Sequence, residues 1–197
     1  MAVALLETPL SPTSTLGPYR KADYFALPEE PRCELIYGRF YVTPSPTPTH
    51  QRVVLLLGVH LNSIAEKTGG YVHVAPLDVT LGDYSVVQPD ILYLSPDWQG
   101  KDDQRIEGAP DLVVEVISPS SDHSDHGEKL KLYAESGVRE YWLVDPAARR
   151  FQFLVNHNGH FEVELEIDGR YRSPILPEIE IDLAAFWKAV DRKRGRG

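Results

Sequence analysis

The sequence predicts a single α/β domain that is followed by a β-rich C-terminal extension. Three observations lead to this prediction. With 197 residues, of which 42% are hydrophobic, the chain suits one globular domain with a sizeable core. Apolar runs rich in β-branched residues, such as residues 111–117, are typical of buried strands, and they alternate with stretches of helical periodicity. The expected order before the extension is α-β-β-α-β-β-β-α-β, without an internal repeat or a second domain.

Helices are predicted where apolar residues recur every three to four positions. In the longest helix, Thr49 is the expected N-cap and Gly69-Gly70 the end. The proline-rich segment 43–49 before it is predicted to be a rigid loop, because proline is excluded from helix interiors. The predicted helices span Tyr19–Leu27, His50–Lys67, Ser124–Ser136 and Asp182–Val190, with Asp182 as the cap of the last.

Strands are predicted for the apolar and alternating runs between turn residues. Residues 97–109 are expected to form a polar connection, and Asn158-Gly159 to form the tight turn of a C-terminal hairpin. The predicted strands are Cys33–Val42 (a pair folded at Tyr37-Gly38-Arg39), Tyr71–Leu81, Val86–Leu94, Leu112–Ser118, Glu140–Val144, Arg149–Val155 and His160–Glu166.

Charge and composition limit the classes of function. A net charge of −9 is unfavourable for a protein that grips phosphate backbones, although basic residues crowd into the tail at 191–197. An extended arm is expected over residues 1–18, which leaves 19–190 as the domain. The single cysteine, Cys33, excludes an internal disulfide and fits a reducing cytoplasm. No apolar stretch reaches the roughly 18 residues of a transmembrane helix, so a cytoplasmic protein without a membrane partner is expected.

Two acidic residues stand out because they accompany apolar strands. Glu115 interrupts the run 111–117, where an ionised carboxylate is costly unless something pairs with it, and the run contains no Lys or Arg. Asp90 opens the apolar run Ile91–Leu94, and the 25 residues between the two acids (115 − 90) suffice for adjacent strands. A divalent cation between them is one explanation. The alternatives are a buried salt bridge for Glu115 and a turn-forming aspartate for Asp90.

A lysine on the following helix adds to this pair of carboxylates. Mg²⁺ takes oxygen ligands and needs only one or two carboxylates besides water and phosphate. It could polarise a phosphoryl oxygen and supply hydroxide, while a lysine stabilises the developing charge. Lys129 shares a helix face with Tyr133, whereas Lys131 lies between Glu128 and Glu135 on what is expected to be a solvated ion-pair face. Lys129 is therefore favoured over Lys131.

Four blocks of sequence resemble a known family. They resemble the Uma-type family of putative restriction endonucleases, which is placed in the PD-(D/E)XK nuclease superfamily, over roughly residues 20–185. The resemblance implies an α/β (α+β) restriction-endonuclease-like core with a central mixed β-sheet flanked by helices. It also implies hydrolysis of DNA phosphodiester bonds with Mg²⁺ or Mn²⁺. The blocks are Val87-Gln88-Pro89-Asp90-Ile91, residues 108–120, Lys129 with Tyr133, and residues 137–146.

The resemblance also implies roles for individual residues. Asp90 matches the PD aspartate and Glu115 the (D/E) carboxylate, and the two would hold the metal. Ile117 stands where the motif lysine belongs, but the family resembled uses a lysine from the next helix, which matches Lys129. Glu34 and His50 match further positions. The alternatives are a surface carboxylate for Glu34 and a capping or core histidine for His50.

Two functions of different classes remain open at this point. The first is a metal-dependent endonuclease. The second is a catalytically silent dimeric interaction or regulatory protein on the same fold, in which Glu115 simply pairs with Lys129. A homodimer or higher homo-oligomer is expected, because cleavage of two strands suits a two-fold axis. The strand of Trp142 and the C-terminal extension are the candidate dimer surface.

Overall fold

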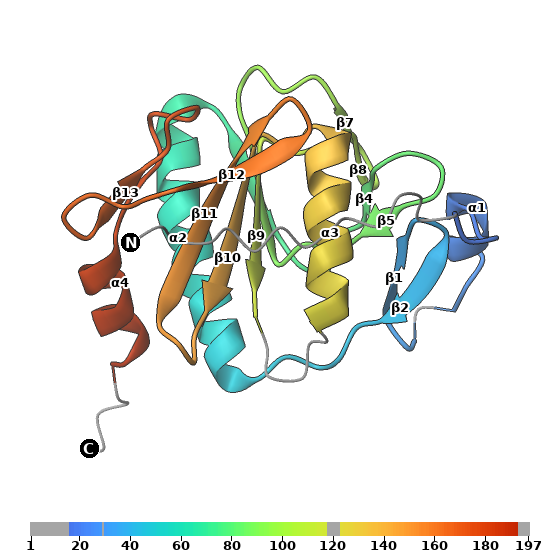
Figure 1. The fold of residues 1–197 in the computed structure, drawn as a ribbon, viewed down its shortest axis with the longest axis horizontal. Helices are drawn as coiled ribbons and strands as arrows, with labels where there is room; N and C mark the ends of the chain where they lie inside the picture. Colours follow the sequence, from blue (N-terminus) through green and yellow to red (C-terminus); the bar gives the residue numbers. More distant parts are fainter. Residues whose placement is uncertain (1–15, 29, 118–122, 193–197) are drawn as a thin grey trace, which may run out of the picture.

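The computed structural model describes residues 16–28, 30–117 and 123–192 of the chain. The predicted N-terminal arm and basic C-terminal tail therefore lie largely outside the described residues. A six-stranded mixed sheet forms the centre of the molecule, in the order β12-β11-β10-β9-β6-β3 (Figure 1). Its strands are β3 (Tyr71–Val74), β6 (Ile91–Leu94), β9 (Leu112–Val116), β10 (Glu140–Asp145), β11 (Arg150–His157) and β12 (His160–Glu164).

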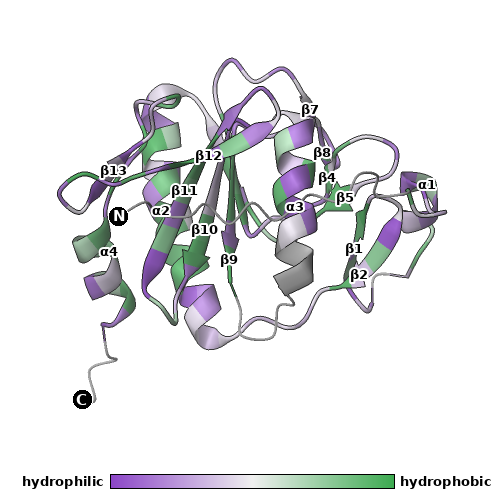
Figure 2. Cartoon of the chain, viewed as in Figure 1, coloured by the Kyte–Doolittle hydropathy of each residue, from purple (hydrophilic) through white to green (hydrophobic). Residues whose placement is uncertain are grey.

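Helices cover both faces of the central sheet. The helices α2 (Pro48–Thr68) and α4 (Leu183–Val190) pack on one face, and α3 (His123–Ser136) packs on the other (Figure 1). The central strands β6 and β9 are buried along their whole length, whereas the edge strand β12 is largely hydrophilic (Figure 2). Strand β9 runs parallel to β10, and α3 forms the crossover between the two, while the other pairs in the sheet are antiparallel. The domain is therefore of the α+β class, with one hydrophobic core on each face of the central sheet.

A second, smaller sheet packs beside α3 and closes the second core. The N-terminal helix α1 (Lys21–Tyr24) contacts its first strand, and a two-stranded ribbon of β13 (Arg170–Arg172) and β14 (Glu180–Asp182) precedes α4. In the described residues, no helix is long and apolar enough to cross a membrane. The strands of the smaller sheet are β1 (Cys33–Ile36), β2 (Arg39–Val42), β4 (Val79–Thr80), β5 (Val86–Val87), β7 (Lys101–Asp102) and β8 (Ile106–Glu107).

Prolines explain where the predicted strands and helices differ from the observed ones. The expected strand 71–81 divides at Ala75-Pro76, and the strand 86–94 divides at Gln88-Pro89, because proline cannot donate to a sheet ladder. The long helix begins at Pro48 rather than His50, since proline is tolerated in a first helical turn. Its N-cap is consequently Thr47, whose hydroxyl accepts a hydrogen bond from the His50 N–H, and not Thr49.

Other predicted elements survive with shifted ends. The hairpin turn at Asn158-Gly159 is confirmed, with both residues at positive φ, and so is the Asp182 cap of α4. The first helix is shorter than expected, at Lys21–Tyr24. The predicted polar connection 97–109 contains the short strands β7 and β8, which extend the smaller sheet.

The side chain of Trp142, on a strand that the sequence offered as part of a dimer surface, lies inside the molecule. It is fully buried, because β10 lies between β9 and β11 and the indole packs edge-on against Phe153 and Tyr171. The indole N–H donates to the carboxylate of Glu140, which is itself fully buried. Trp142 therefore belongs to the core.

The buried carboxylate of Glu140 attaches the C-terminal part of the chain to the sheet. Besides Trp142, it accepts hydrogen bonds from the hydroxyls of Tyr171 and Ser173. Burial raises the pKa of Glu140, while these three donors and the nearby Arg139 lower it. The extension is thus fixed by polar contacts as well as by ring packing.

Replacing Tyr171 by phenylalanine should lower the free energy of unfolding by about 1–3 kcal/mol, because a buried carboxylate loses one donor. The ring itself can stay stacked on Phe153, where the centroids are 3.6 Å apart. Urea denaturation followed by far-UV circular dichroism measures the loss. Tyr71→Phe is the control, since that tyrosine is 63% exposed. Equal midpoints for the two variants would contradict the role given to the hydroxyl.

Candidate active site

The predicted site residues meet at one end of the central sheet. The C-terminal end of β9 and the N-terminal ends of α2 and α3 all reach this end of the molecule (Figure 1). Strand β6 is antiparallel to β9 with Ile91 opposite Val114, so Asp90, one residue before Ile91, lies beside Glu115. The Val116 N–H donates to Asp90 Oδ2 over 2.8 Å and fixes this neighbour relation. The register of the sheet thus brings the two acids together.

Glu115 is buried and receives two hydrogen bonds on the same oxygen. Its Oε1 accepts from Lys129 Nζ over 2.9 Å and from the Tyr133 hydroxyl over 2.8 Å. Lys129 and Tyr133 lie one turn apart on α3, so a single face of that helix supplies both donors. Lys131, the competing lysine, points away from the site, is 47% exposed and pairs with Glu135.

Glu34 holds the other side of Lys129. Its Oε2 lies 2.8 Å from Lys129 Nζ, and its Oε1 accepts the backbone N–H of Gln88 over 2.7 Å. Both oxygens of Glu34 are therefore engaged, and the side chain is buried in β1 rather than placed on the surface. The ammonium group of Lys129 bridges two carboxylates that belong to different sheets.

His50 lies in the first turn of α2 and contacts the other acid. Its Nε2 is 3.1 Å from Asp90 Oδ2, and the ring is buried. Burial disfavours the charged ring, but the hydrogen bond to Asp90 and the charges of Asp90 and Glu115 raise the pKa of His50 above its ordinary value. His50 and the Val116 N–H together orient Asp90.

The cluster carries more negative than positive charge. Burial, together with the nearby Asp90 and Glu34, raises the pKa of Glu115 to about 7, although Lys129 opposes the rise. Burial alone would lower the pKa of Lys129, but Glu115 and Glu34 raise it, so the ammonium stays protonated. Three carboxylates thus face one ammonium and one imidazole, and an added cation would favour the ionised form of Glu115.

The donor atoms that remain fit a hard divalent cation. Both contacts of Asp90 use Oδ2 and both contacts of Glu115 use Oε1; among the described residues, none hydrogen-bonds to Asp90 Oδ1 or Glu115 Oε2. Two carboxylate oxygens with water and substrate phosphate suit Mg²⁺. Over the described ranges, no group of three or more His, Cys, Asp or Glu side chains is arranged to hold a metal. Asp90 and Glu115, with one oxygen each, are the residues that could hold such an ion.

Two contributors to the site received no role from the sequence. The spacing of Tyr133, four residues after Lys129, places it on the same helix face but does not by itself predict its hydrogen bond to Glu115. Gln88 supplies its backbone N–H to Glu34, and its side-chain amide donates to Asp78 over 2.9 Å. The motif Gln88-Pro89-Asp90 indicates a role for the aspartate alone, because the sequence does not predict which backbone N–H groups donate to side chains.

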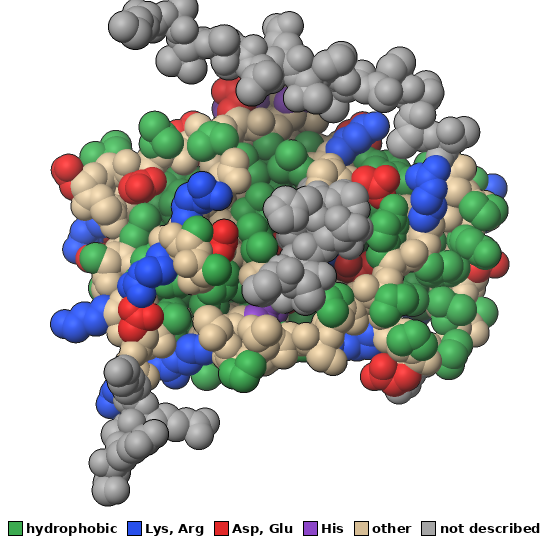
Figure 3. Space-filling model, turned by 60° about the horizontal axis from the view of Figure 1, so that its bottom comes forward, with side chains coloured by type: hydrophobic (Ala, Val, Ile, Leu, Met, Phe, Trp, Pro, Cys, Tyr) green, Lys and Arg blue, Asp and Glu red, His purple; other side chains and the backbone are tan. Residues whose placement is uncertain are grey.

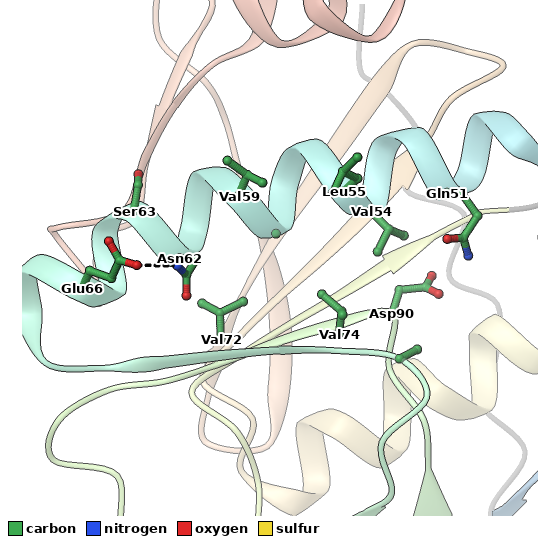
Figure 4. A pocket seen from close by; sticks show the side chains of 12 residues that line it. Gln51, Val54, Leu55, Val59, Asn62, Ser63, Glu66, Val72, Val74 and Asp90 are labelled. Carbon is green, nitrogen blue, oxygen red and sulfur yellow. Dashed lines mark hydrogen bonds between the residues drawn. The ribbon is translucent and has the colours of Figure 1, made fainter.

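The surface around the site has a mixed character. In the view toward this end of the molecule, Lys and Arg side chains lie mainly toward the two sides, and hydrophobic side chains fill much of the area between them (Figure 3). A groove extends from Asp90 along α2, and its walls carry valine and leucine side chains (Figure 4). Positive charge is therefore placed at the margins rather than in one continuous stripe.

Comparisons with known proteins identify the family and the fold. The family model Uma2, described as "Putative restriction endonuclease", matches residues 22–184. A solved structure of a putative nuclease belonging to DUF820 from Anabaena variabilis ATCC 29413 superposes with a TM-score of 0.73. It is 21% identical, and the match covers 88% of this chain and 99% of that one. No curated protein matches the chain.

The family match spans the domain that contains all five site residues. The likeness to the solved structure confirms the predicted restriction-endonuclease-like fold, with its mixed sheet flanked by helices. The resemblance drawn from the motifs around Asp90, Glu115 and Lys129 is confirmed as well. The chain belongs to the Uma2 family of putative restriction endonucleases.

Proposed function

We propose that the protein is an Mg²⁺- or Mn²⁺-dependent endonuclease that hydrolyses phosphodiester bonds of DNA in the cytoplasm. The observation that carries the proposal is the pair Asp90 and Glu115. They lie side by side at a sheet end, each with one oxygen committed to the protein and one without a partner among the described residues. Glu115 is buried and Asp90 beside it is half-buried, and a buried carboxylate such as Glu115 is costly unless it serves a purpose such as cation binding.

The side chains in and around the pair would have different roles in the reaction. Asp90 and Glu115 would hold the ion, which when bound polarises a phosphoryl oxygen and lowers the pKa of water. Lys129 keeps its proton next to Glu115, where a positive charge can stabilise the negative charge that develops on the phosphate or orient the attacking water. Glu34 and Tyr133 position Lys129 and Glu115, and His50 positions Asp90.

The acidic balance of the chain restricts how DNA can bind. Lys and Arg side chains at the two sides of the site face can contact phosphates on either side of the scissile bond (Figure 3). Contacts that are spread in this way bind DNA more weakly than a continuous basic stripe would, and the binding is sensitive to salt. We therefore expect the nuclease to show its highest activity at low ionic strength.

A catalytically silent interaction protein is the second candidate. The observation in its favour is that Lys129 is already neutralised by two carboxylates, so the cluster can serve as a buried ion-pair network between the two sheets. The two candidates differ in their response to metal. A nuclease binds the ion in its folded state and gains stability from it, whereas a purely structural network does not.

Cleavage of a nucleic-acid panel should depend on Mg²⁺ or Mn²⁺ and should fall by about 100-fold or more in Glu115→Gln and in Lys129→Met. The panel contains supercoiled plasmid, linear duplex, single-stranded and branched DNA, assayed on gels. Lys131→Met is the matched control, because it removes a lysine from the same helix without touching the site. Undiminished cleavage by Glu115→Gln would refute the assignment.

Tyr133→Phe should weaken Mn²⁺ binding by about 10–100-fold, because Glu115 loses a donor that orients its carboxylate. Isothermal titration calorimetry measures this without any turnover. Tyr141→Phe is the control: its hydroxyl is buried near the same acids but has no partner among the described residues. The orienting role fails if the two variants bind Mn²⁺ equally well.

The stability of the metal-free protein should depend on Glu115 through pH. Folding raises the pKa of Glu115 from 4.5 to about 7, so the folded protein holds this proton more tightly than the unfolded chain does. The resulting contribution to the free energy of unfolding is fully present below pH 4.5 and is lost as the pH rises through 7. The Tm of Glu115→Gln relative to the natural protein should therefore rise between pH 5 and 8, by on the order of 5 °C. Differential scanning calorimetry in EDTA tests this, and a difference that does not vary with pH would contradict it.

A further inference from the structure

A row of basic side chains lies beside the candidate active site, at the same end of the central sheet. Strand β10 is parallel to β9, and the Ile117 N–H donates to the carbonyl of Val144 over 2.8 Å. The turn after β10 therefore lies at the sheet end that carries Glu115, and α4 also ends on this side of the molecule (Figure 1). The basic row consists of Arg52, Arg149, Arg150, Lys188 and Arg192.

Contacts between α2, α4 and the β10–β11 turn hold the basic row together. Arg52 Nη2 donates to the carbonyl of Ala189, in the last turn of α4, over 3.0 Å. The guanidinium of Arg149 pairs with Asp191, which is the C-cap of the same helix. Arg150 follows directly and begins β11. The basic row is therefore continuous from the first turns of α2 to the start of β11.

The basic row is rich in positive charge although the whole chain has a net charge of −9. The β10–β11 turn and the end of α4 contribute two carboxylates, Asp145 and Asp191. Asp191 is occupied by Arg149, and Asp145 Oδ1 accepts two backbone N–H groups of its own turn. Arg150 and Lys188 are exposed, and neither forms an ion pair with another described residue. Lys and Arg side chains accordingly gather at the left of Figure 3, the side on which α4 lies in Figure 1.

Arg149 has an unusual backbone conformation for an arginine. Its φ is +51°, in the left-handed region that favours glycine or asparagine, so the turn itself does not call for a long side chain. The guanidinium is nevertheless held in place by Asp191 and lies 5.5 Å from the centre of the Trp187 ring, with the side chain 49% exposed. Strained residues of this kind are concentrated at functional sites.

The register of the sheet places Arg150 on the same face as Glu115. Glu115 is beside Leu143, and Leu143 is opposite Gln152, so these three side chains share one face. Arg150 is two residues before Gln152 and faces the same way. Because two strand spacings separate β11 from β9, Arg150 lies about 10 Å across the sheet from the strand of Glu115. That distance corresponds to about three nucleotides along one strand of a DNA duplex.

We propose that the basic row binds the phosphate backbone of duplex DNA on one side of the scissile bond, so that the duplex lies across the sheet end from Asp90 and Glu115 toward α4. The proposal rests on the proposed nuclease function, because it names the surface that holds the substrate of that reaction. Guanidinium forks and ammonium groups suit phosphate oxygens. Continuity with the site favours DNA over an acidic protein, since Arg52 comes two residues after His50, which contacts Asp90.

Fluorescence anisotropy with a labelled duplex of about 20 base pairs, in EDTA and at several salt concentrations, measures binding without cleavage. Arg150→Gln should weaken binding by about tenfold and lower the slope of log K against log salt by about 0.9, the share of one phosphate contact. Lys67→Gln is the matched control, because it removes the same charge from an exposed lysine in the last turn of α2, far from the basic row. Equal losses in the two variants overturn the proposal, and so does a natural protein that does not bind the duplex at low salt.

Arg149→Gly separates DNA binding from stability. Glycine relieves the left-handed strain, and the ion pair that is lost is exposed, so the Tm should not fall. The affinity for the duplex should fall about as far as in Arg150→Gln, because Asp191 is also left without its partner. Differential scanning calorimetry and anisotropy on the same sample compare the two effects. A lower Tm with unchanged affinity would give Arg149 a purely structural role and contradict the proposal.

Kinetics and sedimentation distinguish the surface from the chemistry. Where plasmid is cleaved, Arg150→Gln should raise KM with kcat unchanged, because a phosphate contact away from the reacting atoms binds ground state and transition state equally. A protein that binds through the basic row but cleaves nothing keeps the row and refutes the nuclease. Cleavage with normal DNA binding by Arg150→Gln keeps the nuclease and overturns the row. If that variant instead changes the sedimenting mass and not the DNA affinity, the row contacts an acidic surface of a second copy and the proposal is wrong.

Discussion

The ion pair that Lys129 makes with Glu34 and Glu115 joins three separate parts of the molecule. Glu34 comes from the smaller sheet, Glu115 from the central sheet and Lys129 from the crossover helix. Removing the lysine would leave two buried carboxylates close together, which is a far greater cost than the loss of one contact. The same group therefore fixes how the two sheets lie against each other and sets the charge at the site.

The sequence predicted which side chains lie together better than it predicted the borders of the strands. A carboxylate inside an apolar run required a partner, and helical spacing selected Lys129 over Lys131, which is where the structure places the two lysines. The divisions at Ala75-Pro76 and Gln88-Pro89 were missed because hydropathy continues across them while the hydrogen-bond ladder does not. The N–H that Gln88 donates to Glu34 carries no sequence signal, because it depends on tertiary position alone.

Burial of Trp142 shows a different limit. Aromatic residues are frequent both in cores and at interfaces, so residue type alone does not separate the two. Trp142 is in the core because its strand, β10, has a neighbouring strand on each side. The order of strands in a sheet arises from contacts between distant segments, which residue type does not reveal. The exposed valines and leucines of α2 gave no comparable signal, because the same helix also carries an apolar face toward the core.

The separation of Glu34 and Lys129 along the chain also matters during synthesis. A ribosome-bound or truncated chain that ends before α3 carries Glu34, Asp90 and Glu115 but lacks the ammonium that balances them. Such a chain has these carboxylates without the lysine that pairs with them, and its non-local strand pairings are slow to form. The complete charge arrangement appears only after the crossover helix has docked, so a fragment that ends before α3 lacks the group that links the two sheets.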